Sequence, residues 1–170
     1  MSELLAIVPD DVEEAAQGLL ERACARQLSI VTAESCTGGL VASLLTDVEG
    51  ASRAFERGFI VYTDDAKCEL LSIDRRNLAR WRAVSRETAI AMAEGALRRS
   101  HGDIAVAVTG FAGAAGPDVE PGLVHIACSR NGGQTRHREE HFGNIGRGPV
   151  RLRCLATAID MLRKAGDETG

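Results

Sequence analysis

Apolar residues recur along the chain with two alternating periods, one typical of helices and one typical of strands. The opening segment DDVEEAAQGLLERACARQ (residues 10–27) has apolar positions at helical spacing and predicts a helix that Asp10 or Asp11 caps. The run LSIVTA (28–33) predicts a buried strand, and GGLVASLLTDV (38–48) predicts a helix that begins at glycines. The chain therefore opens as helix, strand and helix.

The middle of the chain continues this alternation. The segment GFIVYT (58–63) predicts a second strand, and DDAKCELLSI (64–73) predicts a short helix capped by one of its two aspartates. Ser85 is the predicted cap of a longer helix in RETAIAMAEGALRRS (86–100). The run DIAVAVTG (103–110) predicts a third buried strand.

The last third predicts a hairpin and a final helix. The segments GLVHIACSR (122–130) and TRHREEHF (135–142) flank an NGG turn, which is a strong hairpin signal. The final helix is expected from Arg147 or Pro149 through Lys164, with a glycine behind it.

Strands that alternate with helices pair in parallel, with helices on both faces of the sheet. We therefore expect an α/β fold: a three-layer α/β/α sandwich with a mostly parallel sheet and an antiparallel edge hairpin. The length of 170 residues suggests a single domain over residues 1–170. In such sheets ligands bind beyond the carboxyl ends of the strands.

The composition narrows the class of function. The net charge of −4 argues against a general nucleic-acid binder, whose affinity depends on many cations. The five cysteines form no CxxC pair, which favours free thiols over a metal or redox motif. No apolar run is long enough for a membrane span and no signal peptide opens the chain, so we expect a cytoplasmic protein away from membranes. No metal or organic cofactor is expected, and a homodimer is the favoured assembly.

The loop AESCTGG after the first strand places Ser35 and Cys36 just before Gly38 and Gly39. Backbone N–H groups at such a strand-to-helix turn favour a phosphate or a developing oxyanion. The loop lacks the GK[ST] and GxGxxG patterns of the common nucleotide-binding motifs. Three roles stay open for Ser35: a nucleophile, a helix cap or a partner in loop hydrogen bonds. Cys36 is a competing nucleophile if its pKa is lowered.

A serine nucleophile needs a base, and Lys67 is the candidate. It lies early in the short helix after the second strand, and a partly desolvated lysine can accept a proton. Tyr62, the single tyrosine, is expected to end the same strand with its hydroxyl toward the site. The alternatives are a solvated lysine and an aromatic side chain at the rim. The four histidines belong to no recognisable triad and are interpreted as surface or structural residues.

A second loop, TGFAGAAGPDVEPG, follows the third predicted strand and is rich in glycine. Long glycine-rich loops in compact domains are often functional, although a plain surface loop is the alternative. Arg147 and Arg151 are placed at the start of the last helix, where the helix dipole disfavours cations. That placement suggests an anionic ligand for Arg147, or a surface ion pair with Glu139 or Glu140.

Taken in order, AESCTGG, VxYxxxAK and VTGxAG, followed by PGLVHIA and FGNIGR, closely resemble the CinA carboxy-terminal domain family. That family includes the nicotinamide mononucleotide amidohydrolases. The resemblance implies an α/β/α sandwich of the stand-alone form. It also implies hydrolysis of nicotinamide mononucleotide to nicotinate mononucleotide and ammonia, a step of pyridine nucleotide salvage.

The resemblance also implies roles for individual residues. Ser35 is the expected nucleophile, Lys67 its base and Tyr62 an assisting group. The expected contacts with the small nucleotide substrate, including the amides around the oxyanion, come from Glu34, Cys36, Thr37, Gly38, Gly39, Thr109, Gly110 and Arg147.

The sequence departs from the family pattern in the second loop, where AGAAGP (112–117) replaces a proline- and glycine-rich stretch. It also has VEG at 48–50 in place of VPG, and Asp64 where an asparagine is common. Two alternative functions follow: an inactive nucleotide-binding homologue, or an interaction protein associated with competence or DNA damage.

Overall fold

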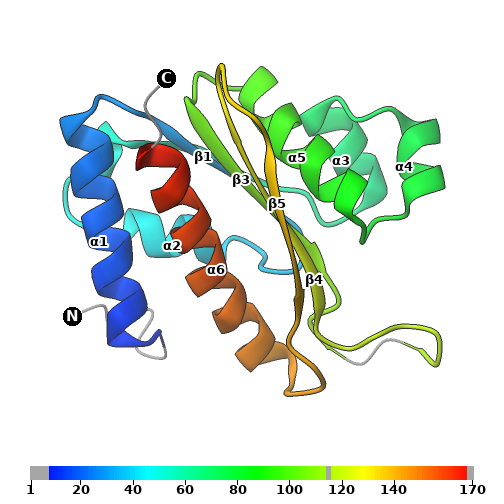
Figure 1. Ribbon diagram of the computed structural model, residues 1–170. Helices are drawn as coiled ribbons and strands as arrows, with labels where there is room; N and C mark the ends of the chain where they lie inside the picture. The colour runs from blue at the N-terminus through cyan, green and yellow to red at the C-terminus, as the bar shows by residue number, and fades with distance from the viewer. Residues whose placement is uncertain (1–7, 114–115, 168–170) are drawn as a thin grey trace.

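The computed structural model describes residues 8–113 and 116–167, which form one sheet between two layers of helices (Figure 1). The elements, in chain order, are α1 (Asp10–Ala25), β1 (Ile30–Glu34), α2 (Leu40–Thr46), the 3-10 turn η1 (Ala51–Arg53), β2 (Phe55–Ile60), α3 (Asp64–Leu71), α4 (Arg75–Trp81), α5 (Arg86–Arg98), β3 (Ile104–Gly110), β4 (Leu123–Arg130), β5 (Arg136–His141) and α6 (Arg147–Asp167).

The sheet has the strand order β2-β1-β3-β4-β5. Strand β1 pairs in parallel with both β2 and β3, so that Glu34 lies opposite Ile60 on one side and Val108 on the other. Strands β3, β4 and β5 then pair antiparallel, and the β4–β5 hairpin forms one edge. The predicted α/β sandwich with an antiparallel edge is therefore confirmed, and the parallel part is confined to β2, β1 and β3.

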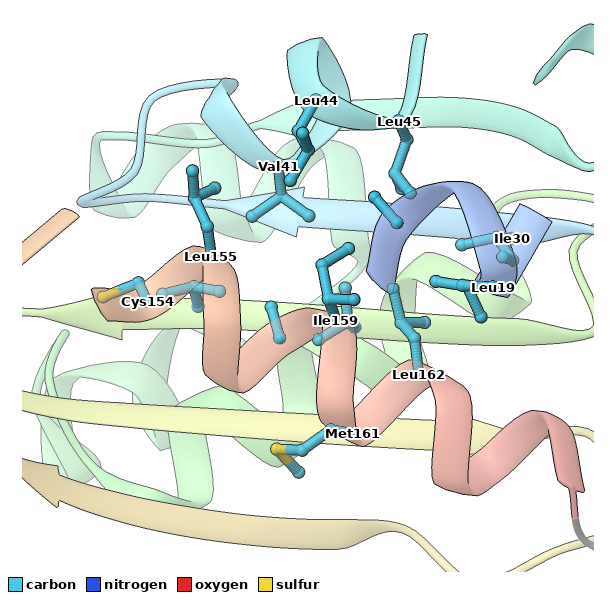
Figure 2. Close-up of a cluster of buried hydrophobic side chains, with 14 of the residues drawn as sticks. Leu19, Ile30, Val41, Leu44, Leu45, Cys154, Leu155, Ile159, Met161 and Leu162 are labelled. Carbon is cyan, nitrogen blue, oxygen red and sulfur yellow. The ribbon is translucent and has the colours of Figure 1, made fainter. Parts of the chain in front are cut away.

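Helices α1, α2 and α6 cover one face of the sheet, while α3, α4 and α5 cover the other (Figure 1). The side chains of β1 alternate between the two cores, with Ile30 in the first and Val31 and Ala33 in the second. Figure 2 shows the first core, where α1, α2 and α6 contribute Leu19, Leu44 and Ile159 among others. Both faces of β1 and β3 are thus buried, as the continuous apolar runs predict.

Alanines fill the second core between the sheet and α5 and allow a close approach of the two layers. Gly95 of α5 lies so near α3 that a Cβ built on it would be 2.4 Å from the carbonyl oxygen of Leu71. Helix α5 therefore packs closely against α3, the helix that carries Lys67.

Several predicted boundaries are wrong. Strand β2 begins at Phe55 and ends at Ile60, so Tyr62 lies beyond the strand. Its first four residues, FERG, are half exposed because β2 is an edge strand, which hides them from an apolar pattern. Helix α6 continues past Lys164 to Asp167, and α4 was not predicted because its only buried residue is Leu78.

The caps confirm one prediction and correct two. The Ser85 hydroxyl accepts the amide of Thr88 at 3.1 Å and caps α5 as expected. Helix α3 is capped by Thr63, whose hydroxyl accepts the amide of Ala66 at 3.1 Å. Pro9 precedes α1 as its N-cap residue, and Asp10 and Asp11 lie inside its first turn. The aspartates of α1 and α3 instead face the positive ends of the helix dipoles.

Candidate active site

Ser35 directly follows β1 at the carboxyl ends of the parallel strands. Its amide donates to the carbonyl of Val108 at 3.0 Å, which extends the pairing with β3 by one residue. Its carbonyl accepts the amide of Gly38 at 3.1 Å and closes the turn of the AESCTGG loop. The side chain is 8% exposed, so the hydroxyl lies at a nearly closed surface next to two strand ends.

Glu34 holds the beginning of α2 in place. Its carboxylate is fully buried and accepts hydrogen bonds from the amides of Gly39 at 3.1 Å, Val41 at 3.0 Å and Ala42 at 2.8 Å. These are the amides that a helix leaves unpaired at its first turn. The sequence-based expectation gave Glu34 a contact with substrate, whereas in the fold its oxygens already hold the helix.

This arrangement narrows the set of amides that can stabilise an oxyanion. Of the four expected donors from Cys36 to Gly39, the amide of Gly38 pairs with Ser35 and that of Gly39 pairs with Glu34. The amides of Cys36 and Thr37 follow Ser35 directly in the chain, and the Cys36 amide also lies close enough to its own sulfur to lower the pKa of that thiol. Successive amides after a nucleophilic serine are well placed for an oxyanion.

Lys67 is a buried amine on α3, with 1% of its surface exposed. Its Nζ atom donates to the backbone carbonyl of Tyr62 at 3.2 Å and lies 3.8 Å from Oδ1 of Asp64. Burial lowers the pKa of Lys67 below its ordinary value, and the nearby carboxylate of Asp64 opposes that shift. The predicted desolvated lysine is therefore present, since the side chain is not a solvated surface lysine.

The pairing of β1 with β2 brings Lys67 to the loop of Ser35. The carbonyl of Glu34 accepts a hydrogen bond from the amide of Val61 at 2.8 Å. Glu34 directly precedes Ser35 in the chain, and Val61 directly precedes Tyr62. The carbonyl that anchors Lys67 Nζ thus belongs to the residue after Val61. The charges of Lys67 and Cys36 also influence each other, and a Cys36 thiolate raises the pKa of Lys67. Ser35 and the carbonyl that anchors Lys67 therefore follow adjacent strands, and the predicted Ser35–Lys67 pair stays a prediction.

Tyr62 contributes its backbone to this site. Its side chain is 65% exposed, and Ile60 beside it is 58% exposed. Ile60 packs against the loop so closely that a Cβ built on Gly39 would lie 2.9 Å from its Cδ1 atom. Gly39 also has φ of 96°, which other residues rarely adopt. The turn and the close approach of Ile60 thus both require a glycine at position 39. The exposed ring of Tyr62 lies at the edge of the candidate site.

Cys36 points into the first core. It is 6% exposed and belongs to the buried cluster that contains Cys154 of α6. The nearby Cys154 thiol and, to a lesser degree, Arg151 lower the pKa of Cys36, whereas burial and the Glu34 carboxylate oppose that shift. The nearby Cys36 thiol and burial raise the pKa of Cys154. Ser35 and Cys36 therefore have different surroundings, although they are adjacent in sequence.

Thr109 and Gly110, at the end of β3, make contacts within the protein. The Thr109 hydroxyl donates to the carbonyl of Ala83 at 2.6 Å and is 1% exposed. A Cβ built on Gly110 would lie 2.8 Å from the carbonyl oxygen of Leu123, so its glycine is explained by pairing with β4. Their predicted contacts with substrate remain predictions. Of the glycine-rich loop that follows, Ala114 and Ala115 lie outside the described residues.

Two arginines of α6 face the two loops. Arg147 is exposed at the first residue of the helix, and a Cβ built on Gly113 of the second loop would lie 3.7 Å from its Nε atom. One turn later, Nη2 of Arg151 donates to the carbonyl of Thr37 in the first loop at 2.7 Å. Of the expected ion-pair partners of Arg147, Glu140 instead pairs with Arg138 at 2.6 Å.

The sequence pattern indicated Arg151 only as a cation at the start of a helix. It did not predict the hydrogen bond from Arg151 to the carbonyl of Thr37. The one available signal was the i, i+4 spacing from Arg147, which places both side chains on one face of α6. It also missed a histidine pair: Nδ1 of His125 lies 3.1 Å from Nε2 of His137, and burial lowers the pKa of both. The pair lies on the β4–β5 hairpin, where both residues face α5.

A groove with a volume of about 920 Å³ lies elsewhere, between α1 and the segment after α2. Six carboxylates line it, including Glu13, Glu21 and Glu49. None of the predicted catalytic residues lines this groove. Over the described part of the chain, no cluster of three or more His, Cys, Asp or Glu side chains is arranged to hold a metal ion. No helix in that part could cross a bilayer.

Comparison with known proteins places this geometry in context. The family model of the CinA C-terminal domain matches residues 12–165. A CinA-like protein of Akkermansia muciniphila is 45% identical over 144 residues, which are 82% of this chain and 35% of that protein. A putative competence-damage inducible protein of Acetivibrio thermocellus is 42% identical over 139 residues, 81% of this chain and 33% of that protein. The chain thus spans about a third of the length of the curated relatives it matches.

Solved structures share the whole fold. The competence/damage inducible protein CihA from Agrobacterium tumefaciens matches with a TM-score of 0.91 and 43% identity, covering 95% of this chain and 99% of that one. A CinA superfamily protein from Escherichia coli matches with a TM-score of 0.84 and 34% identity, with 91% of each chain covered.

Proposed function

Because the chain belongs to the CinA C-terminal domain family, we propose that it is an amidohydrolase that converts nicotinamide mononucleotide to nicotinate mononucleotide and ammonia. The main support is one observation: a buried lysine with a lowered pKa is anchored at the strand end beside Ser35. Burying an amine costs folding free energy. Because strongly shifted pKa values cluster at functional sites, this burial favours a functional role for the neutral form of Lys67.

In the first step Lys67, uncharged when substrate binds, takes the proton of the Ser35 hydroxyl. The Ser35 oxygen attacks the carboxamide carbon, and the positive charge of the nicotinamide ring makes that carbon more electrophilic. In the resting structure Lys67 Nζ donates to the carbonyl of Tyr62, so the amine has to turn toward the Ser35 hydroxyl before proton transfer.

The negative oxygen of the tetrahedral intermediate is stabilised by the amides of Cys36 and Thr37. Loss of one such donor typically costs about 3 kcal/mol of transition-state stabilisation. Glu34 holds this loop by accepting hydrogen bonds from amides at the start of α2. Arg151 holds it by donating to the carbonyl of Thr37. The donors are thereby oriented before the reaction begins.

The protonated Lys67 then gives its proton to the departing ammonia. The acyl group stays on Ser35 until water attacks it, with Lys67 acting again as the base. Tyr62 was expected to share this role, but its exposed ring favours a contact with the substrate at the rim. Ser35 and Lys67 thus act both in forming the acyl-enzyme and in its hydrolysis.

Arg147 supplies the contact for the phosphate of the nucleotide. It stands exposed at the start of α6 beside Gly113 of the second loop. A guanidinium binds phosphate through two parallel hydrogen bonds. The carboxamide at Ser35 and the phosphate at Arg147 would then lie at opposite ends of one bound molecule.

An alternative is a protein that binds the nucleotide without cleaving it. The altered loop at Ala112–Pro117 favours this reading, and the names of two relatives refer to competence and damage and not to an amidase. Calorimetric titration of nicotinamide mononucleotide, run beside an ammonia assay on the same protein, separates the two. Ammonia release supports the amidase, while heat of binding without ammonia supports the alternative.

A further inference from the structure

Two histidine rings meet on the face of the β4–β5 hairpin that packs against α5 (Figure 1). Nδ1 of His125 lies 3.1 Å from Nε2 of His137, and the stacked rings have 5.3 Å between their centres. His125 lies opposite Glu139 in the pairing of the two strands and His137 lies opposite Ala127, so the rings are diagonal neighbours. His125 is 6% exposed and His137 is half-buried. The contact therefore joins the edge strand β5 to β4 with little access to water.

The contact has room for only one proton between the two ring nitrogens. One nitrogen has to donate its N–H group, and the other has to accept with its lone pair. A first added proton is compatible with this hydrogen bond, because an imidazolium N–H can donate to a neutral ring. A second added proton leaves two N–H groups facing each other at 3.1 Å and two like charges on stacked rings. The doubly protonated pair is therefore incompatible with the contact.

The charged groups of β5 do not remove this conflict. One carboxylate oxygen of Glu139 is 3.7 Å from Nδ1 of His125, but the other oxygen is 3.0 Å from Nε2 of His141. His141 also contacts the Glu120 carboxylate at 2.7 Å through its Nδ1 atom. Glu139 is thus shared between two imidazoles. On the other side of β4, the residue opposite His125 is the uncharged Thr109 of β3.

The pKa values of the two rings agree with this geometry. Burial lowers the pKa of both His125 and His137 below the ordinary value of 6.5, and the two rings also oppose each other's charge. Helix α5 adds one charge of each sign, because Glu87 raises both pKa values while Arg86 lowers that of His137. The folded pair is therefore neutral near neutral pH, and it takes up protons only at a lower pH than free histidines do.

We propose that the His125–His137 pair is an acid-sensitive contact of the β4–β5 hairpin, and that uptake of the second proton separates the rings and releases β5 from β4. Among the strands that the structure describes, β5 pairs with β4 alone. It can therefore separate while β1 keeps its pairing with β2 and β3. Other side chains of β5 hold it weakly, since Arg138 and Asp160 form a partly exposed ion pair at 3.3 Å.

Release of β5 would also affect the proposed substrate site. Strand β5 ends at His141, shortly before Arg147 at the start of α6. A released strand would leave this turn less well held, and with it the arginine that is placed to bind the phosphate. This consequence rests on the proposed function, whereas release of the hairpin does not.

The test is amide hydrogen exchange on the full chain between about pH 7 and about pH 5, the range in which free histidine titrates. Protection is corrected for the intrinsic pH dependence of exchange. We expect protection of the hydrogen-bonded β5 amides to fall by up to about tenfold per pH unit for each extra proton that the open state binds. Protection of the β1 amides should stay nearly constant.

Glutamine variants separate the histidine pair from other acid effects. His137→Gln keeps a partner for His125 that cannot become charged, so it should remove the fall in β5 protection. His125→Gln removes the same conflict from the other ring and is used if the first variant folds poorly. His101→Gln, a change at an exposed histidine outside the hairpin, is the matched control and should behave as wild type.

Three outcomes would overturn the proposal. One is a β5 protection that does not change relative to that of β1. Another is a fall in β5 protection that persists in both glutamine variants. The third is a parallel loss in β1 and β5, which would mean unfolding of the whole domain.

The link to the substrate site has its own measurement. If ammonia release is measurable, the ratio of KM in wild type to KM in His137→Gln should rise several-fold as the pH falls over the same range. Titration of the substrate phosphate cancels in this ratio, and a constant ratio would contradict the link. Hairpin release in a protein that never releases ammonia would contradict the amidase alone.

Discussion

Lys67 donates a hydrogen bond of 3.2 Å from Nζ to the backbone carbonyl of Tyr62, at the strand end next to Ser35. This contact anchors a buried amine at that strand end, and the one carboxylate within 4 Å of it that the structure shows is Asp64, 3.8 Å away and exposed. A backbone carbonyl accepts from the amine in either protonation state. The lysine can therefore lose its proton without losing its position.

The first prediction concerns the pH dependence of turnover. Burial lowers the pKa of Lys67, and only the neutral amine can take the Ser35 proton. We expect kcat/KM for nicotinamide mononucleotide to rise with pH and to level off below the ordinary lysine value of about 10.4. A pH–rate profile measures this. A rate that is flat or falls over the rising limb would exclude Lys67 as the base.

The second prediction concerns the stability of Lys67→Met. The folded-state pKa of Lys67 is lower than the unfolded one, so the unfolded chain binds more protons between the two values. Wild-type stability therefore gains from this group as pH rises through that window. We expect Lys67→Met to be inactive, and more stable than wild type at neutral pH.

Denaturant unfolding of both proteins from about pH 6 to about pH 10 checks the sign, because the advantage of Lys67→Met should shrink as the pH rises. Lys164→Met, a change at an exposed lysine of α6, is the matched control and should show no such trend. An advantage that grows with pH would contradict the buried, neutral amine.

The third prediction concerns Glu34, which accepts three amide hydrogen bonds at the start of α2. In Glu34→Gln an NH₂ group replaces one acceptor and faces an amide donor. We expect a loss of about 2 kcal/mol in the free energy of unfolding, the usual magnitude for hydrogen bonds to a charged group. Glu14→Gln, an exposed change in the first turns of α1, should cost much less. Equal losses in the two variants would show that Glu34 does not hold the loop.

The fourth prediction concerns Arg147. If it binds the phosphate, Arg147→Ala should raise KM for nicotinamide mononucleotide by roughly 10- to 100-fold, the value of one charge-assisted contact. Turnover at saturation should change little. Arg153→Ala, at an exposed position of the same helix, serves as the control.

The nucleoside that lacks the phosphate gives a second control for Arg147. It should be cleaved equally by wild type and by Arg147→Ala, because the contact in question is missing in both. A defect of Arg147→Ala toward the nucleoside would mean that the arginine acts on the loop and not on the phosphate.

Local patterns were sufficient to predict the fold and to single out the loop of the candidate site. The apolar runs around β1 and β3, the Ser85 cap and the NGG turn each depend on residues near in sequence. The loop after β1 is recognisable from its glycines. Such features are set by backbone conformation and burial, which leave a direct trace in the residue pattern.

The remaining features depend on contacts between distant segments. Glu34 folds back onto the amides of α2 only because the loop turns sharply at Gly39. The Arg151–Thr37 contact and the His125–His137 pair follow from helix placement and strand register, which a single sequence does not display. The start of β2 was missed because an edge strand tolerates exposed polar residues.

Ammonia release from nicotinamide mononucleotide by Ser35→Ala and Cys36→Ala, measured beside wild type, tests the central claim most directly. The account predicts a fall of roughly 10³-fold or more for Ser35→Ala and a rate within about tenfold of wild type for Cys36→Ala. Wild-type turnover in Ser35→Ala, with the activity lost instead in Cys36→Ala, would contradict the serine mechanism.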